Sequence, residues 1–380
     1  TFISAGAGSG KTPRLTEILH RELSAKRVRP VGVIATTFTK KAATELRERV
    51  RGHLLGQGEF ALANAMGQAR IGTVNSVCGQ LIERFAFEAG MAVDLQVVEE
   101  AQAATLLDRV IDTVMDGAAM GEFLSIARRL GLAESWKEEL QKLVNQVRAN
   151  DIPSERLRAF AEANAQDLLT HFPRPGKADL SDELRNAIRS ALPGIERQAE
   201  TGGKKNTNDY LALLRGFARD LEANSAAWGD WVKLSKTFPE KGLAPLAEPI
   251  AAVAARVAEH PILHQDIGRS LAQMFDLAAQ ALGIYAESKR ELGVLDFTDQ
   301  EHLLLGLLDR PAVAEVLAEE LDLLMVDEFQ DTSPIQLALF LKLARFARRV
   351  FWVGDVKQAI YGFRGSDTEL MLAILQALPE

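Results

Sequence analysis

The chain has 380 residues, of which 47% are hydrophobic and 25% charged. These values are ordinary for a soluble globular protein with roughly two to three domains. The net charge of -8 excludes a protein that grips nucleic acid with its whole surface, so any such contact is expected in a local groove. No apolar run approaches the ~18 residues that span a bilayer, and no signal peptide opens the chain. The single cysteine, Cys78, excludes an intrachain disulfide and fits the reducing cytoplasm, where we expect the protein.

Strand and helix patterns alternate at both ends of the chain. Apolar or β-branched runs of strand length occur at Thr1–Ala5, Val31–Phe38, Arg70–Val74, Leu323–Val326 and Val350–Val353. Helical patterns follow several of them, at Lys11–Lys26, Lys40–Leu55, Ser76–Glu88 and Ser333–Ala347. Strand followed by helix, repeated, predicts an α/β fold with a parallel sheet.

The middle of the chain has a helical composition. Apolar residues recur there on one helical stripe, as in Leu106, Leu107, Val110, Ile111 and Val114. Two polar breaks, at 172–177 and 201–206, are expected to be loops. We therefore predict one α/β domain formed by 1–95 and 292–380, interrupted by a mostly helical insertion at 96–291. Trp136, Trp228 and Trp231 are expected in the core of that insertion rather than in a site.

A glycine-rich segment between the first strand and the first helix has the composition of a phosphate-binding loop. Its residues are Ala5, Gly6, Ala7, Gly8, Ser9, Gly10, Lys11 and Thr12. The glycines let backbone N–H groups curl around phosphates, Lys11 can reach the β- and γ-phosphates, and Thr12 can bind Mg²⁺. A chance glycine-rich turn is disfavoured, because the required strand and helix flank the loop. The segment predicts a site for a nucleoside triphosphate.

Two carboxylates follow the apolar run Leu323–Val326. Asp327 would hold Mg²⁺, directly or through water, and Glu328 would polarise the attacking water. The alternative is a pair of acids that cap the next helix, which is a common arrangement. A phosphate loop in the same chain favours the catalytic interpretation.

Six ordered segments resemble those of the UvrD/Rep-type DNA helicases, and within them most closely the AddA/RecB helicase–nuclease subunits. They are AGAGSGKT at Ala5–Thr12, TTFTKKAATELRERV at Thr36–Val50, GTVNSVC at Gly72–Cys78, LDFTDQE at Leu295–Glu301, VDEFQDTSPIQ at Val326–Gln336 and VGDVKQAIYGFRGSD at Val353–Asp367. The resemblance covers both ends of the chain but not its helical middle. It implies that 1–95 and 292–380 form a RecA-like P-loop NTPase domain that uses ATP and Mg²⁺.

The resemblance also assigns roles to single residues. On the nucleotide side, it matches Lys11 to a phosphate contact, Thr12 and Asp327 to the metal, and Glu328 to the catalytic base. Gln358 matches a glutamine that senses the γ-phosphate, and Arg364 an arginine that reaches it. On the DNA side, the matched positions are Thr37, Phe38, Thr73, Asn75, Tyr361 and Phe363.

Three of the DNA-side positions are aromatic. Phe38, Tyr361 and Phe363 would stack on bases of a single strand, and core packing is the alternative for them. Lys40 would contact phosphate, or else belong to a solvated helix face. The chain departs from the family in having Asn75 in place of a usual His, Lys40 in place of Asn, and Pro13 in place of an adenine-facing Arg.

Together these features favour an ATP-dependent DNA helicase and translocase, with 3′→5′ movement expected from the resemblance. We expect the N-terminal part of a subunit that processes double-strand breaks on single-stranded and duplex DNA, with an AddB/RecC-like partner and no membrane. A stand-alone UvrD-like repair helicase remains open, as does an ATP-gated DNA-binding module without motor activity. The motifs of a second RecA-like domain are missing, so we expect the fragment to bind nucleotide weakly, to hydrolyse it slowly and not to unwind DNA.

Overall fold

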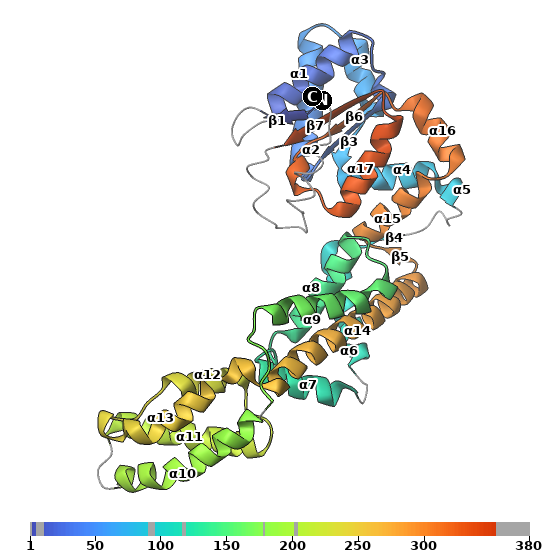
Figure 1. Cartoon of the computed structure of the whole chain (residues 1–380). Coiled ribbons are helices and arrows are strands. Elements are labelled where there is room, and N and C mark those ends of the chain that lie inside the picture. Colours follow the sequence, from blue (N-terminus) through green and yellow to red (C-terminus); the bar gives the residue numbers. More distant parts are fainter. Residues whose placement is uncertain are drawn as a thin grey trace. The chain divides into compact units, whose positions relative to one another are not determined.

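The computed structural model describes residues 2–4, 11–89, 96–115, 119–177, 179–200 and 204–354 (Figure 1). The chain forms two compact units. Unit 1 comprises Thr1–Thr105, Asn145–Ile152 and Ala286–Glu380, and unit 2 comprises Leu106–Val144 and Pro153–Tyr285. Unit 1 thus includes 96–105, 145–152 and 286–291, which lie inside the predicted helical insertion. The expected boundaries at 95/96 and 291/292 stay a prediction. So does the division into an ATP-binding motor domain and a helical insertion.

Unit 1 contains a five-stranded parallel sheet, which confirms the predicted α/β fold. The strand order is β1-β7-β6-β2-β3. The strands are β1 (Phe2–Ser4), β2 (Val33–Thr37), β3 (Arg70–Thr73), β6 (Leu323–Val326) and β7 (Arg349–Gly354). The register aligns Ser4 with Gly354 and Thr37 with Thr73. A separate parallel pair joins β4 (Gln96–Val97) to β5 (Val294–Leu295).

Helices cover both faces of the sheet, because alternate side chains of each buried strand point to opposite faces. On β6, Leu323 and Met325 pack with one helix layer, whereas Leu324 faces the other. The first layer is α1 (Lys11–Ser24), α2 (Lys40–Gly56) and α3 (Phe60–Ala65). The second layer is α4 (Val74–Arg84), α15 (Phe297–Leu307), α16 (Pro311–Glu320) and α17 (Pro334–Phe346). A short helix, α5 (Ala86–Ala89), follows α4.

The described residues of unit 2 form helices joined by loops, with no strand among them. The helices that belong to it wholly or in part are α6 (Glu100–Val114), α7 (Ala119–Leu130), α8 (Trp136–Ala149), α9 (Leu157–Thr170), α10 (Leu180–Glu200), α11 (Lys205–Glu222), α12 (Trp228–Lys236), α13 (Ala244–Ala254) and α14 (Pro261–Leu292). Trp136, Trp228 and Trp231 are buried, which confirms their predicted place in the core. The predicted break at 172–177 is a loop. Of the break predicted at 201–206, residues 201–203 lie outside the described residues, and α11 already begins at Lys205. None of the described helices combines the length and apolar character needed to cross a bilayer.

Candidate nucleotide and nucleic-acid site

The predicted site residues follow the carboxyl ends of the five parallel strands. The phosphate loop follows β1, the acidic pair follows β6, and the predicted DNA contacts follow β2 and β3. Carboxyl ends of parallel strands share one edge of the sheet, and ligands of open α/β sheets bind outside that edge. Neighbouring strands lie ~4.8 Å apart. At this carboxyl edge the acidic pair after β6 is one strand from the DNA-type residues after β2 and two strands from those after β3.

Part of the predicted site lies outside the described residues. This applies to Ala5, Gly6, Ala7, Gly8, Ser9, Gly10, Gln358, Tyr361, Phe363 and Arg364. Lys11 and Thr12 are the first two residues of α1, directly after the loop. A helix N-terminus favours phosphate groups, so this position suits their predicted roles, which stay predictions.

The acidic pair lies in a loop with an unusual backbone. The N–H group of Asp327 donates to the carbonyl of Thr36 at 2.9 Å, which extends the β2–β6 pairing by one residue. Glu328 has φ = 52° and ψ = 42°, in the left-handed region, and its N–H group donates to Asp327 Oδ1 at 3.0 Å. Residues with a Cβ rarely adopt this conformation, and those that do cluster at functional sites.

Gln330 links the acidic loop to the end of β7. Its side chain is 3% exposed, and its Nε2 group donates to Glu328 Oε2 at 2.5 Å. A Cβ added at Gly354, the last residue of β7, would lie 2.6 Å from Gln330 Oε1. The sequence analysis did not single out Gln330, although it lies two residues after Glu328 in the VDEFQDTSPIQ segment. Its amide fixes one oxygen of the predicted catalytic base.

The residues suited to a magnesium ion are few. Among the described residues, no group of three or more His, Cys, Asp and Glu side chains is placed to hold a metal. Mg²⁺ in NTP sites keeps several waters and uses only one or two protein oxygens plus the substrate phosphates. Two protein oxygens are therefore enough for such a site, and Asp327 and Thr12 stay the predicted pair.

The predicted DNA contacts after β2 and β3 lie in the N-terminal turns of α2 and α4 or just before them. Thr73 caps α4 by accepting a hydrogen bond from the Ser76 N–H group at 3.2 Å. Lys40 opens α2 and is exposed, with its Nζ 3.7 Å from Glu99 Oε1. Thr37 is buried, and its hydroxyl donates to the carbonyl of Thr39 at 3.2 Å. These positions make Lys40 and Thr73 accessible to a ligand and turn the Thr37 hydroxyl toward its own chain.

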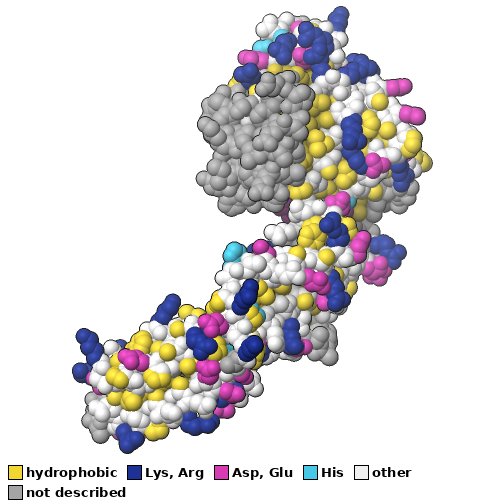
Figure 2. All heavy atoms as spheres, viewed as in Figure 1, with side chains coloured by type: hydrophobic (Ala, Val, Ile, Leu, Met, Phe, Trp, Pro, Cys, Tyr) yellow, Lys and Arg dark blue, Asp and Glu magenta, His cyan; other side chains and the backbone are white. Residues whose placement is uncertain are grey.

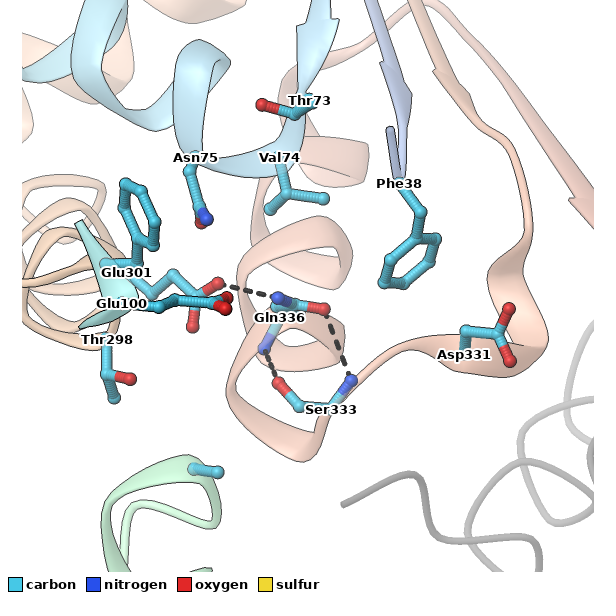
Figure 3. Close-up of a pocket in the computed structure, with 12 residues that line it drawn as sticks. Phe38, Thr73, Val74, Asn75, Glu100, Thr298, Glu301, Asp331, Ser333 and Gln336 are labelled. Atoms are coloured by element: carbon cyan, nitrogen blue, oxygen red, sulfur yellow. Dashed lines mark hydrogen bonds between the residues drawn. The ribbon is translucent and has the colours of Figure 1, made fainter. Parts of the chain in front are cut away.

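Two adjoining cavities lie beside these residues within unit 1, and Figure 3 shows the residues that line the smaller one. They have volumes of ≈ 460 Å³ and ≈ 770 Å³, and Phe38, Thr73, Asn75, Glu100 and Phe297 line both. The smaller cavity is also lined by Glu301, Asp331, Ser333 and Gln336, and the larger one by Lys40, Glu99 and Gln300. We call the two together the Phe38 pocket. Because Asp331 and Ser333 follow β6, the loop with the acidic pair continues directly into its wall.

Glu301 is a buried acid in the wall of the Phe38 pocket. It comes from α15 and accepts a hydrogen bond from Gln336 Nε2 at 2.6 Å, as Figure 3 shows. Burial raises the pKa of Glu301 to about 7, and the charge of Asp296 adds to this, whereas Gln336 and Arg148 act in the opposite direction. Sequence reasoning quoted Glu301 in the LDFTDQE segment but gave it no role.

A buried ionic cluster fixes the start of α15. Asp296 caps this helix in a capping box with Asp299. Its carboxylate also accepts from Arg148 at 2.5 Å and from Lys289 at 3.0 Å. Burial alone would raise the pKa of Asp296, but the hydrogen bond and charge of Arg148 outweigh it and hold that pKa well below its usual range. The cluster therefore holds in place the helix that carries Gln300 and Glu301.

Comparison with known proteins agrees with this arrangement. A model of the family described as the UvrD/REP helicase N-terminal domain matches residues 1–379. Proteins named as subunits of an ATP-dependent helicase/nuclease are 24% identical in Natranaerobius thermophilus and 26% identical in Clostridium novyi, and each alignment covers 98% of this chain and 34% of the relative. The protein of that name from Bacillus pumilus is 26% identical over 98% of this chain and 35% of its own length.

The chain thus spans about a third of the length of these curated relatives. Their shared name confirms the predicted resemblance to the helicase–nuclease subunits. The match over 1–379 also extends the resemblance across the helical middle, where the sequence analysis found no motif. The chain belongs to the UvrD/REP helicase N-terminal domain family.

Proposed function

We propose that the chain is the N-terminal, ATP-binding part of an ATP-dependent DNA helicase and translocase of the AddA/RecB kind. It would move 3′→5′ on single-stranded DNA and process double-strand breaks together with a second, AddB/RecC-like subunit in the cytoplasm. The observation that carries the proposal is the shared carboxyl edge, where the acidic pair after β6 lies beside the DNA-type residues after β2.

On the nucleotide side, the proposal assigns one task to each residue. The backbone of 5–10 and Lys11 hold the phosphates, while Thr12 and Asp327 hold Mg²⁺, which neutralises phosphate charge when bound. Glu328 orients the attacking water and accepts its proton, and the Gln330 hydrogen bond holds the Glu328 carboxylate for this task. Gln358 and Arg364 would contact the γ-phosphate.

On the DNA side, aromatic stacking and one cation supply binding that is tolerant of sequence. Phe38, Tyr361 and Phe363 would stack on bases, at roughly 1–3 kcal/mol per base, and Lys40 would contact a phosphate. Thr37, Thr73 and Asn75 would contact the strand. Asp331 and Ser333 line the pocket beside Phe38. A shift of the loop after Glu328 would therefore change the contacts of the bound DNA strand.

The test is ATP hydrolysis by the full-length protein with and without single-stranded DNA. We expect strong stimulation by DNA and its loss in Lys11→Ala, whereas Lys236→Ala, an exposed change in unit 2, should be silent. Unchanged hydrolysis in Lys11→Ala would instead support a DNA-binding module without motor activity. A nuclease domain in the full-length protein would favour the break-processing subunit over a stand-alone UvrD-like repair helicase. Residues 1–380 span about a third of the length of the relatives. We propose that they alone hydrolyse ATP slowly and do not unwind DNA.

A further inference from the structure

The amino edge of the unit 1 sheet, where its strands begin, carries more positive charge than its buried acids need. Five arginines lie there, and we call them the arginine edge: Arg21, Arg27, Arg29, Arg348 and Arg349. Each has a nitrogen at most 3.4 Å from a carboxylate oxygen of Glu22 or Asp322. Two arginines would neutralise these two acids, so three positive charges are in surplus. Like charges this close repel each other, and the stability of the acids does not account for the surplus.

Neighbouring acids do not cancel the surplus. Glu320 pairs with an arginine of α4 at 2.5 Å. Glu59 and Glu319 are matched in number by two further exposed cations, Lys26 and Arg345. Figure 2 shows Lys and Arg side chains gathered at the upper end of unit 1, where Figure 1 places α1 and α3. The arginine edge is therefore locally basic, although the whole chain has a net charge of -8.

The two carboxylates hold guanidinium groups that face solvent. The side chains of Glu22 and Asp322 are 1% exposed, whereas those of the arginine edge are 42% to 62% exposed. Arg29 also donates to the carbonyl of Glu319 at 2.8 Å. A guanidinium that is already held by an acid beneath it loses less side-chain entropy when it binds a second anion. The arginine edge is therefore a preorganised row of donors.

The width of the row fits the spacing of phosphates along DNA. Arg348 directly precedes β7, Arg29 lies just before β2, and β6 runs between these two strands. Two strand spacings amount to ~10 Å. One strand of a duplex carries a phosphate for every ~3.4 Å of helix axis, so this width faces about three phosphates. Their charge equals the surplus of the arginine edge.

The surroundings favour a duplex over a single strand or a protein. The large exposed hydrophobic side chains of the described chain all lie outside 19–32, 319–322 and 345–350. Single strands bind by stacking on aromatic side chains, and the centre of a protein interface is aromatic or apolar. The backbone of a duplex needs only cations and hydrogen-bond donors, and Arg offers both to one phosphate.

We infer that the arginine edge binds the phosphate backbone of duplex DNA, at the opposite end of the sheet from the proposed single-strand site. The contact is independent of sequence, because every base pair presents the same phosphates. The inference rests on the proposed action on DNA and adds to it a second contact surface.

The test measures how duplex binding depends on salt. The full-length protein binds a fluorescent thirty-base-pair duplex, closed at both ends by hexaethylene glycol linkers so that it offers no single strand, and anisotropy is recorded over a series of salt concentrations. Arg21→Gln combined with Arg348→Gln removes two phosphate contacts, whereas Arg27, Arg29 and Arg349 still pair with the buried acids. The slope of log affinity against log salt concentration should become less steep by about 1.8.

Two further double variants serve as controls. Arg158→Gln combined with Arg219→Gln removes two exposed arginines of unit 2 that also pair with acids, and it should leave the slope unchanged. An equal loss of slope in this control would show that the arginine edge has no special role, which overturns the inference. Arg21→Lys combined with Arg348→Lys keeps both charges and should keep the steep slope.

The outcomes separate the inference from the proposed function. If the Gln double variant fails to fold, as judged by its circular dichroism melting curve, Arg21→Gln alone should still reduce the slope by about 0.9. An unchanged slope in the folded variants, with normal binding of an oligothymidine strand, would overturn the inference alone. Binding of a polyglutamate peptide that needs Arg21 and Arg348, while duplex binding does not, would assign the arginine edge to an acidic protein segment instead. Failure of the full-length protein to bind either DNA would overturn the proposed function as well.

Discussion

Two pairs of acids in unit 1, one pair at each edge of the sheet, have opposite kinds of partner. At the amino edge, Asp322 precedes β6 and is 1% exposed, and Arg29 holds it through Nε at 2.8 Å and Nη2 at 3.0 Å. Glu22, at the end of α1, lies 3.3 Å from Arg349 and 3.4 Å from Arg27. At the carboxyl edge, Glu328 and Glu301 accept hydrogen bonds from the neutral amides of Gln330 and Gln336.

The difference separates stability from chemistry. A guanidinium neutralises a buried carboxylate and keeps it ionised, which anchors strands and helices but lowers its basicity. An amide orients a carboxylate without neutralising it, so the acid stays available to a proton or a ligand. We therefore expect changes of the acids at the amino edge to alter unfolding, and changes of those at the carboxyl edge to alter turnover or binding.

The largest expected effect is on hydrolysis at the carboxyl edge. Glu328→Gln preserves the size of the side chain but removes the proposed proton acceptor. ATP turnover by the full-length protein should therefore fall roughly 10²–10⁴-fold, the range of general-base contributions. Nucleotide affinity, measured with a fluorescent ATP analogue, should change little. Glu319→Gln, an exposed acid beside the amino edge, should retain full turnover. Normal turnover in Glu328→Gln would contradict the expectation that acids at the carboxyl edge serve catalysis.

Next in size is a stability effect at the amino edge. Asp322→Asn leaves the Arg29 guanidinium without its buried charge partner, so the free energy of unfolding in urea should drop by about 2–4 kcal/mol. Glu315→Gln, an exposed change in α16, should stay within about 0.5 kcal/mol of the parent. Burial raises the pKa of Asp322, but its hydrogen bonds to Arg29 outweigh this and lower it below 3.8.

The Asp322 contribution should therefore be present above pH 4 and be lost as the pH falls through the lowered pKa. Parent and Asp322→Asn should converge in stability at acidic pH. An equal difference between them at pH 3 and at pH 7 would show that packing, rather than charge, accounts for the loss.

Glu301 should give the opposite pH dependence. Its pKa is raised from 4.5 to about 7, so the folded state binds the proton more tightly than the unfolded state does. The stabilisation is complete below pH 4.5 and is lost as the pH rises toward 7, and the loss is on the order of 3 kcal/mol. Glu301→Gln should flatten this slope in urea unfolding between pH 5 and pH 8, whereas the exposed change Glu315→Gln should keep it. If the stability of Glu301→Gln depends on pH as steeply as that of the parent, other groups account for the pH dependence.

The smallest effect tests whether the carboxyl edge also has ordinary stabilising contacts. Ser333 caps α17 and forms a capping box with Gln336. Ser333→Ala should reduce the free energy of unfolding by about 1 kcal/mol. Ser190→Ala, an exposed change within α10, should have almost no effect. A loss of several kcal/mol in Ser333→Ala would mean that the cap, rather than the pocket, is the reason for the serine here.

The sheet could be predicted from sequence because each strand is a short apolar run with a polar end. The predicted bounds of Leu323–Val326 are those of β6, since burial on both faces requires a continuous apolar run. The start of α4 was placed two residues late, at Ser76, because Thr73 was taken as strand rather than as the helix cap that it also forms. In that region the break at Phe85 was missed, because its apolar spacing continues into α5.

The pocket could not be predicted, because its contacts join elements distant in sequence. Glu301 and Gln336 lie 35 residues apart. No local sequence pattern predicts that the buried amide of one will contact the buried carboxylate of the other. Gln300 resembles any polar residue of a helix until the packing of α15 against α4 buries it. Local signals find strands, caps and glycine loops, whereas the burial of a polar side chain is a property of the folded chain.

The left-handed backbone of Glu328 has a consequence for how this protein can change under selection. Glycine adopts φ = 52° without steric penalty, so Glu328→Gly relieves a conformation that a residue with a Cβ tolerates poorly. A library selected for heat resistance alone would therefore drift toward glycine here and discard the proposed proton acceptor. Selection for turnover would restore the glutamate. The residue found at position 328 would therefore show whether a population was selected for stability or for activity.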